Sequence, residues 1–320
     1  MNHQSKRLII SDMLLLLVII FLNIMDRIRN LSGVIYAIVS SATFGLIPLF
    51  TIPLIDNGIS SPSILCYRFL IAAAAMGIIV LVAGNRLRLQ RSEWGVVFLL
   101  SLLYAATAIL LIESYKFIPS GIATTIHFLY PLAVTLTMSL FFRVKVGNAT
   151  YLAIVVSLAG VTLLAWGNHT DGDFHHGVMI ALTTVVTYAA YIVGVMKSRA
   201  AHIDSFTLTF YVLLFGAVIF FIYAITTTGI EMIKGWASWR NIIMVALVST
   251  VLSDLSLVIA IKRIGSITTS ILGSMEPLTA VVIGVLYFGE KLDMESVTGL
   301  ILIIIAVIMV ILSSRAKESV

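Results

Sequence analysis

The stretch PSGIATTIHFLYPLAVTLTMSLFFRVKV, residues 119–146, recurs without a gap as GSITTSILGSMEPLTAVVIGVLYFGEKL, residues 265–292. Each residue of the first copy aligns with the residue 146 positions later, so that Pro131 falls on Pro277. A register this regular indicates an internal duplication. Two related halves in an apolar chain are typical of carriers, which build two alternately accessible faces around one central site.

The composition predicts a protein that crosses the lipid bilayer several times. The chain is 60% hydrophobic and 11% charged, with a mean hydropathy of +1.10, whereas soluble domains are roughly 45–50% apolar and about 25% charged. The net charge of +5 comes from Lys and Arg in short connectors rather than from one face, which argues against nucleic acid as a partner. The single cysteine, Cys66, excludes an intrachain disulfide and a cysteine-based zinc cluster.

Ten apolar segments approach the roughly 20 residues that cross about 30 Å of hydrocarbon, and lipid favours helices at that depth because a helix satisfies its own backbone. These segments are residues 33–54, 63–83, 94–114, 120–142, 148–166, 177–196, 205–226, 241–261, 266–288 and 297–312. The predicted fold class is therefore an all-α polytopic membrane protein with ten transmembrane helices.

The distribution of Lys and Arg predicts the orientation, because cytoplasmic connectors carry the basic excess. One set of connectors holds thirteen basic residues: Arg27, Arg29, Arg86, Arg88, Arg91, Arg143, Lys145, Lys197, Arg199, Lys262, Arg263, Arg315 and Lys317. The other set holds four: Lys116, Lys234, Arg240 and Lys291. The ten-helix body should therefore begin and end in the cytoplasm, with a cytoplasmic C-terminus, and the expected location is the cytoplasmic (inner) membrane.

The duplication extends over nearly the whole body, since residues 33–45 also align with residues 177–189. Five helices are an odd number, so the second half should enter the membrane from the opposite side and form an inverted repeat. We divide the chain into a first repeat at 31–167, a connector outside the cytoplasm at 168–176, a second repeat at 177–314 and a tail at 315–320.

The N-terminal extension, residues 1–30, does not fit this scheme. Its apolar part is interrupted by Asp12 and leaves an apolar run of only 13 residues from Met13. If it crossed the membrane, basic residues would lie outside, against the charge rule. Two interpretations stay open: an added or interfacial helix, or a start codon assigned too early, with Met25 beginning the native protein.

Several motifs in these segments resemble the EamA-like family of the drug/metabolite transporter superfamily. They are SSATFG at 40–45, YRFLIAAAA at 67–75, PSGIATTIHFLYPL at 119–132 and SMEPLTAVVIGVLYFGEKL at 274–292. The first half departs from the pattern of the second. Tyr130 stands where the second half has Glu276, and Arg143-Val144-Lys145 stands where it has the turn Gly289-Glu290-Lys291. The resemblance implies a secondary carrier, commonly an exporter of small metabolites, with the first, third and fourth helices of each half around a central cavity.

Three polar residues predict a substrate-binding site near the membrane midplane. Glu276 lies about eleven residues into the ninth segment, or roughly 16 Å at 1.5 Å per residue. His127 reaches a similar depth from the other face, and Tyr130 lies one turn beyond it. Pro131 and Pro277 follow directly, and because proline disrupts the preceding turn, we expect a hinge at each. A structural hydrogen bond remains the alternative role for Glu276 and for His127.

Other buried polar residues suggest coupling or gating. Asp254 in the eighth segment and Glu276 lack an evident basic partner, so both could exchange protons as the coupling ion. Arg68 and Glu113 fall in the outer third, where they could form a structural ion pair or an outer gate. Tyr188 and Tyr191 are weaker candidates to stack on a substrate.

The sequence contains no motif of a serine hydrolase, zinc protease, P-loop NTPase or EF-hand protein, so we expect no enzyme, no cofactor and no resident metal. We therefore predict a secondary transporter that exports small metabolites such as amino acids by alternating access. A cationic drug exporter is the second hypothesis. A membrane enzyme acting on lipid head groups and a membrane sensor or scaffold are the hypotheses outside transport. The oligomeric state stays open, a homodimer included.

Overall fold

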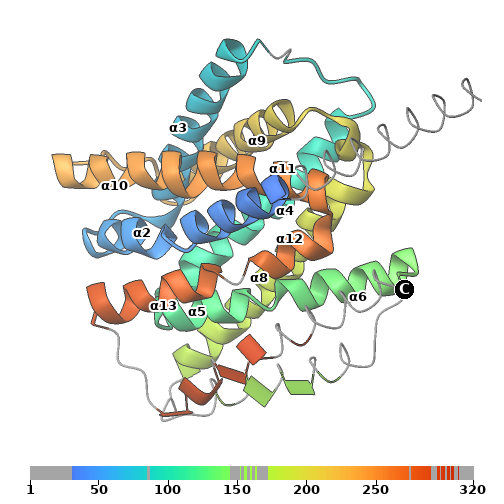
Figure 1. Cartoon of the computed structure of the whole chain (residues 1–320). Helices are drawn as coiled ribbons and strands as arrows, with labels where there is room; N and C mark the ends of the chain where they lie inside the picture. Colours follow the sequence, from blue (N-terminus) through green and yellow to red (C-terminus); the bar gives the residue numbers. More distant parts are fainter. Residues whose placement is uncertain are drawn as a thin grey trace, which may run out of the picture.

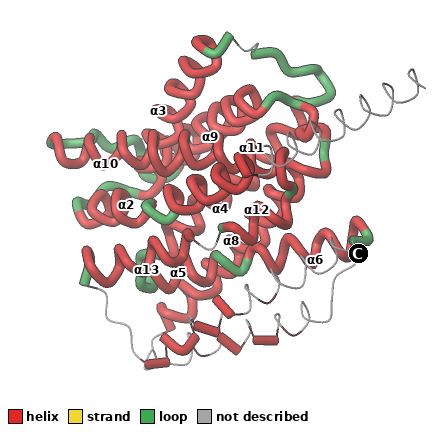
Figure 2. The backbone as a smooth tube through the Cα atoms, in the orientation of Figure 1, coloured by secondary structure: helices red, strands yellow, loops and turns green. Residues whose placement is uncertain are grey.

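The computed structural model describes residues 31–84, 87–144, 172–273 and 275–289 continuously, together with single positions between 152 and 163 and between 294 and 309. Every secondary-structure element in these residues is helical (Figures 1 and 2). Seven helices are long and apolar enough to cross a membrane: Leu31–Asp56, Ser61–Val82, Trp94–Ser114, Ser120–Phe142, Asp173–Lys197, Ser205–Thr226 and Trp236–Ile264. The prediction of an all-helical membrane protein is confirmed.

A helix at residues 31–44 begins the described body, and α2 (Ile47–Asp56) follows it after a turn. The elements after α2 are α3 (Ser61–Val82), α4 (Trp94–Ser114), α5 (Ser120–His127), α6 (Tyr130–Phe142), α8 (Gly172–Lys197), η1 (Arg199–His202), α9 (Ser205–Thr226), α10 (Trp236–Ala246), η2 (Leu247–Leu252), α11 (Ser253–Ile264), α12 (Ser266–Leu272) and α13 (Met275–Tyr287).

Some predicted segments lie wholly or largely outside the described residues. They are the N-terminal extension at 1–30, the predicted spans at 148–166 and 297–312, and the tail at 315–320. The predicted connector at 168–176 is shorter than expected, because α8 already begins at Gly172. His175 and His176 therefore belong to the first turns of a helix.

Two helices are interrupted next to the prolines that the sequence singled out. α5 ends at His127 and α6 begins at Tyr130, with Pro131 in its first turn. The aligned interruption separates α12 from α13, which begins at Met275. Proline has no N–H to donate to the carbonyl four residues earlier, so the regular hydrogen-bond ladder cannot continue through either position. The predicted bends are present, whereas hinge motion at them stays a proposal.

A third interruption, at Gly45 between helix 31–44 and α2, was not predicted. A Cβ atom at Gly45 would lie 2.6 Å from the backbone oxygen of Glu276 and 2.8 Å from the Cβ of Thr279. Only a residue without a side chain permits this approach. The turn at Gly45 therefore packs directly against the first turn of α13.

The helix Trp236–Ile264 contains a π-helical segment, η2, which the sequence analysis also missed. The Thr250 hydroxyl donates a hydrogen bond of 2.8 Å to the carbonyl of Val245, five residues earlier. Such a segment inserts one extra residue into a turn and is frequent at functional sites. It turns the Thr250 side chain toward α3, where Arg68 lies.

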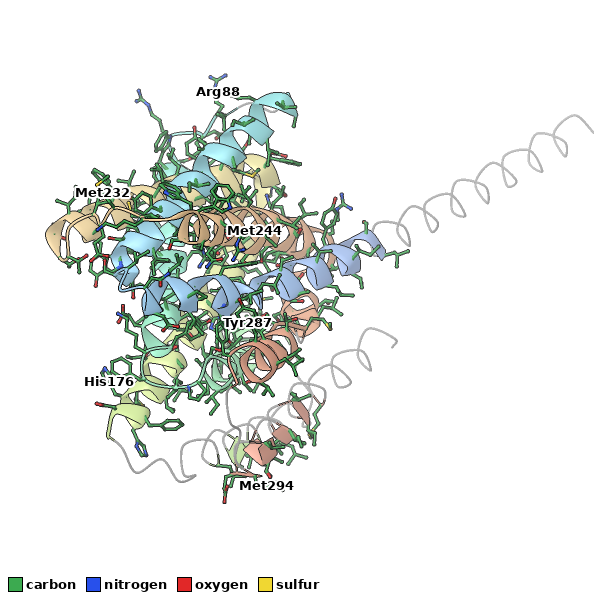
Figure 3. All side chains as sticks on the ribbon, turned by 90° about the vertical axis from the view of Figure 1, so that its left-hand side faces the viewer. Arg88, His176, Met232, Met244, Tyr287 and Met294 are labelled. Carbon is green, nitrogen blue, oxygen red and sulfur yellow. The ribbon has the colours of Figure 1, made fainter. Side chains whose placement is uncertain are left out.

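Among the helix contacts are those of α3 with α9, α4 with α8, α2 with α10, α5 with α13 and α6 with α12 (Figure 1), and α8 also packs against α5 and α6. Large apolar side chains remain exposed on the outer faces, among them Leu70, Phe98, Val186 and Phe221. Met232 and Tyr287 are exposed as well, and Met232 lies at the edge of the molecule in Figure 3. This apolar exterior suits contact with lipid.

Candidate functional site

The three interruptions bring polar side chains from separate helices into one buried centre. α13 contacts both α2 and α5, which places Glu276 beside the end of α5 and the turn at Gly45. His127 and Glu276 have 0% and 1% of their surface exposed. The structure therefore brings together the two residues that the sequence placed at similar depths.

The Nε2 atom of His127 lies 3.7 Å from Oε1 of Glu276. This distance allows electrostatic attraction but exceeds that of a hydrogen bond. Within the described part of the chain, neither atom has a hydrogen-bond partner. Buried polar atoms are nearly always satisfied, so these two atoms are candidates to bind a shared proton or a polar group of a substrate.

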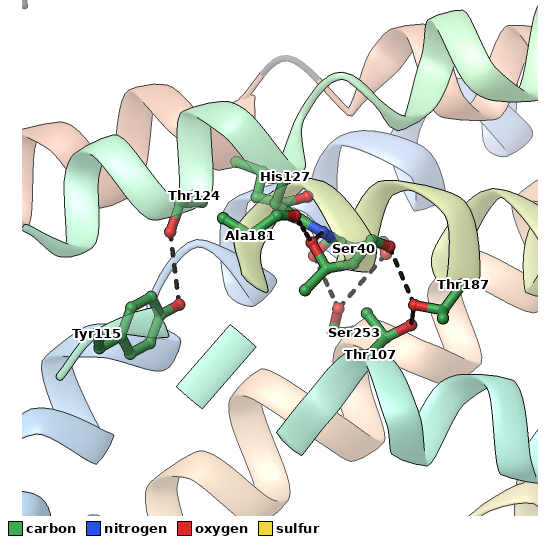
Figure 4. Close-up of polar contacts among 10 residues, drawn as sticks. Ser40, Thr107, Tyr115, Thr124, His127, Ala181, Thr187 and Ser253 are labelled. Atoms are coloured by element: carbon green, nitrogen blue, oxygen red, sulfur yellow. Dashed lines mark hydrogen bonds and ion pairs between the residues drawn. The ribbon is translucent and has the colours of Figure 1, made fainter. Parts of the chain in front are cut away.

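The other ring nitrogen of His127 has a partner on α8. Nδ1 lies 2.7 Å from the hydroxyl oxygen of Thr184, and that hydroxyl donates a hydrogen bond of 2.5 Å to the carbonyl of Ala181 (Figure 4). This chain of contacts anchors one edge of the imidazole to the backbone of α8 and turns the opposite edge toward Glu276.

Aromatic rings enclose His127. The Tyr188 ring centroid lies 4.9 Å from that of His127, and the Tyr130 centroid lies 5.4 Å away. Phe44, from the end of helix 31–44, stacks on His127 at 6.1 Å and on Tyr188 at 5.8 Å. Tyr191 stacks on Tyr188 at 6.1 Å. The four predicted residues His127, Tyr130, Tyr188 and Tyr191 thus form one cluster, which Glu276 borders.

Tyr130 makes a close contact with the second interruption. A Cβ atom at Gly273 would lie 2.0 Å from the Tyr130 hydroxyl oxygen and 2.8 Å from the carbonyl oxygen of Ser270. Glycine at position 273 is therefore required for the Tyr130 ring to occupy its position.

A second buried polar group lies farther along the same row of rings. Tyr104, whose ring is 5.2 Å from that of Tyr191, donates a hydrogen bond of 2.7 Å to Oδ1 of Asp254. The Nε of Arg68 donates to the Thr250 hydroxyl at 2.6 Å. The Arg68 charge acts on the Asp254 carboxyl, so Asp254 does have a basic neighbour, contrary to the sequence interpretation. Arg68 itself is 1% exposed.

Arg68 and Glu113 have different partners from those that the sequence suggested. Glu113 forms an ion pair with Lys116 at 2.9 Å, and both side chains are about one-third exposed, at 30% and 37%. An ion pair of Arg68 with Glu113 was one of the roles suggested by their positions near the same membrane face. The sequence analysis missed the π-helical segment that brings Thr250 to Arg68.

A surface cavity of about 790 Å³ lies away from the buried cluster, at the ends of α2 and α10. It is lined by Asn57, Gly58, Ile59, Glu231, Met232, Lys234, Ala237 and Ser238. None of the predicted site residues lines it. No three His, Cys, Asp or Glu residues are grouped to hold a metal ion in the described ranges.

Sequence reasoning missed Thr184 and Thr250 as parts of these buried groups. Threonine is common in membrane helices, where its hydroxyl usually bonds to the preceding turn of its own helix. Both hydroxyls do so here, and each also contacts a charged or titratable residue of another helix. No sequence signal marks this second contact.

The comparisons with known proteins agree with this architecture. The chain is 24% identical over 264 residues to "Uncharacterized transporter YvbV" of Bacillus subtilis, which covers 79% of this chain and 83% of that protein. It is 24% identical over 250 residues to "Uncharacterized transporter YdfC" of the same organism, covering 76% and 79%. One solved structure, described only as the crystal structure of a protein, shares the fold with a TM-score of 0.67, 18% identity and coverage of 90% of this chain and 99% of that one.

The model of the EamA-like transporter family matches this chain twice, at residues 31–166 and 175–312. Together the two matches span most of the 320 residues. The helical architecture and the relatives' names point the same way. The chain belongs to the EamA-like transporter family and is a multi-pass membrane transporter of the drug/metabolite transporter type.

Proposed function

We propose that this protein is a secondary transporter that exports small metabolites carrying an amino group, such as amino acids, across the cytoplasmic membrane. The substrate-binding residues in this proposal are His127, Tyr130, Tyr188, Tyr191 and Glu276. The observation that carries it is the gap between His127 Nε2 and Glu276 Oε1, both of which lack a partner among the described residues. An ammonium N–H is a donor suited to that gap.

Alternating access by two inverted halves is the second part of the proposal. Three observations support it: the repeated sequence, the two family matches and the pairing of the interrupted helices. α5 lies against α13 and α6 against α12, which is the arrangement of two aligned helices that run in opposite directions. In the repeat, α4 corresponds to α10, and α8 corresponds to the helix pair that contains α2. The contact of α4 with α8 therefore has a counterpart in the contact of α10 with α2.

Proton coupling is the third part, with the proton and the substrate competing for the same gap. A proton on either Glu276 or His127 Nε2 would satisfy both atoms once the two side chains approach to hydrogen-bond distance, and an ammonium group placed beside them would donate to both. Asp254 and Arg68 act in this scheme as a gating pair at the other end of the aromatic row, because successive ring contacts of Tyr188, Tyr191 and Tyr104 lead from His127 to the hydrogen bond between Tyr104 and Asp254.

Export of organic cations is the second candidate function. It is favoured by the two buried carboxyls, Glu276 and Asp254, which lie at the two ends of the row of aromatic rings, because aromatic rings with acidic residues bind cations well. The two candidates differ at Arg68. A substrate carboxylate needs a cation such as Arg68, whereas an organic cation does not.

The test is counterflow in proteoliposomes with four matched probes: L-phenylalanine, 2-phenylethylamine, 3-phenylpropionate and 2-phenylethanol. The amino-acid proposal predicts exchange of L-phenylalanine that is lost in Arg68→Gln. The cation proposal predicts exchange of 2-phenylethylamine that survives the same substitution. Exchange of the carboxylate or the alcohol, but of neither amine, would contradict both.

The orientation is tested separately by cysteine accessibility. In a Cys66→Ser background, single cysteines at Lys116 and Lys234 should react with an impermeant reagent added outside, and cysteines at Arg88 and Arg199 should not. Labelling of all four positions from one side would contradict the inverted topology with a cytoplasmic C-terminus.

A further inference from the structure

We infer that Thr184 is a positioning residue that fixes the tautomer of His127 and thereby makes the gap to Glu276 a site for one donor. The inference starts from the Thr184 hydroxyl, which has one hydrogen. That hydrogen is donated to the carbonyl of Ala181 at 2.5 Å, and a carbonyl can only accept. Toward His127, 2.7 Å away, the hydroxyl oxygen must therefore accept.

It follows that His127 Nδ1 carries the hydrogen of the neutral ring. Which nitrogen of a histidine is protonated is set by the hydrogen bond that the other side of the ring makes. With the hydrogen on Nδ1, Nε2 presents a lone pair to Glu276 Oε1 at 3.7 Å. Two acceptors that face each other in a dry interior require one shared donor, which is either a proton or a substrate N–H that approaches both atoms from the side.

Among the described residues, no donor lies within hydrogen-bond distance of His127 Nε2 or Glu276 Oε1. The titratable groups that face the pair are Tyr130 from α6 and Tyr188 from α8. The Tyr130 hydroxyl is directed at Gly273, and Phe44 contributes only an apolar ring. Asp254 acts on Tyr188 from the far side of the aromatic row. Thr184 thus decides whether Nε2 accepts or donates at the site.

The chain offers a matched control one turn along α8. The Thr187 hydroxyl is also 2.7 Å from a side-chain oxygen, that of Thr107 on α4, and it does not contact His127 (Figure 4). Thr184→Val and Thr187→Val therefore remove the same atom from the same helix. Thr184→Ser restores the hydroxyl and should behave as the wild type.

The direct experiment is nitrogen NMR of the whole protein in nanodiscs, with ¹⁵N-labelled histidine and His127→Gln to assign the signal. Near neutral pH we expect a protonated Nδ1 and an unprotonated Nε2 in the wild type, in Thr187→Val and in Thr184→Ser. Thr184→Val should lose this tautomer. A wild-type spectrum with the hydrogen on Nε2, or a Thr184→Val spectrum equal to that of the wild type, would overturn the inference.

A second measurement connects the tautomer to transport and rests on the proposed function. In proteoliposomes with 2-phenylethylamine or L-phenylalanine, Thr184→Val should lower both proton-driven transport and counterflow by about tenfold, because the same Nε2 acceptor serves the proton and the substrate amine, whereas Thr187→Val should stay within about twofold of the wild type. Unchanged transport in Thr184→Val, or an equal loss in Thr187→Val, would contradict the positioning role. If the wild type moves neither probe, the proposed function fails, whereas the NMR result still decides the tautomer.

Discussion

Two contacts between the interrupted helices, α5–α6 in the first copy and α12–α13 in the second, occupy equivalent places in the two copies of the repeat. Position 127 aligns with 273 and position 130 with 276, so exchanging the copies relates the contact of His127 with Glu276 to that of Tyr130 with Gly273. The first joins two titratable groups across 3.7 Å. The second is a close steric contact of a phenol with a glycine. The two copies thus share the helix arrangement, whereas only the contact of His127 with Glu276 joins two titratable groups.

This difference indicates how a duplicated chain can acquire one polar site. The proline after each contact interrupts both helices in the same way, which opens equivalent places in the two halves. Only one of them holds a carboxyl and an imidazole. The other is filled by the Tyr130 ring, which also belongs to the aromatic cluster around His127.

The largest expected effect comes from removing the charge at the polar contact. Glu276→Gln keeps the size of the side chain, but it can no longer exchange a proton. Proton-driven transport in proteoliposomes should fall by about 100-fold, in line with roughly 2.7 kcal/mol for a buried interaction of a charged group. Glu113→Gln, which alters an ion pair whose side chains are about one-third exposed, is the control and should stay within about twofold. Full activity of Glu276→Gln would remove the distinction between the two contacts.

A smaller effect is expected at the steric contact. The added methyl group in Gly273→Ala would overlap the Tyr130 hydroxyl, so the free energy of unfolding should fall by about 2 kcal/mol. The thermal unfolding midpoint in detergent measures this change. Gly95→Ala is the control, because a Cβ atom there meets nothing within 4 Å.

Combining Gly273→Ala with Tyr130→Phe removes the overlapping hydroxyl and should recover part of the lost stability. A Gly273→Ala variant as stable as Gly95→Ala would show that the contact is not steric.

The smallest effect is expected where the same two helices end. Arg143 adopts a left-handed conformation with φ of 55°, and the aligned residue, Gly289, has φ of 66°. That conformation costs a residue with a side chain about 1 kcal/mol relative to glycine. Arg143→Gly should therefore raise the unfolding midpoint slightly, and Gly289→Ala should lower it by a similar amount. A stabilising Gly289→Ala would mean that the two helix ends are not equivalent.

Much of this architecture could be predicted because each membrane-spanning helix leaves a long apolar segment in the sequence. Apolar segments of spanning length predicted the seven candidate spans of the described residues, and the two prolines predicted two of the three interruptions. The interruption at Gly45 was not predicted, since it depends on a close approach to the backbone of Glu276 rather than on a proline. The π-helical segment at 247–252 likewise has no sequence pattern of its own.

The site was predicted in part, for a related reason. His127, Tyr130 and Glu276 were found because a polar residue deep in a membrane helix is unusual and its depth can be counted. Depth alone does not give the direction of a side chain. The sequence therefore suggested a pairing of Arg68 with Glu113, whereas the structure places Arg68 with Thr250 beside Asp254. The role of Thr184 likewise depends on the direction of its side chain, which the sequence does not give.

The central claim is that His127 and Glu276 act together as one site, and a double-variant cycle tests it most directly. Proton-driven transport of the best amine probe should be measured for His127→Gln, Glu276→Gln and the two combined. Residues that work as a unit are not additive, so each single variant should lose nearly the full activity and the double variant should lose little more. Losses that multiply in the double variant would show that the two residues act independently, and would contradict the account.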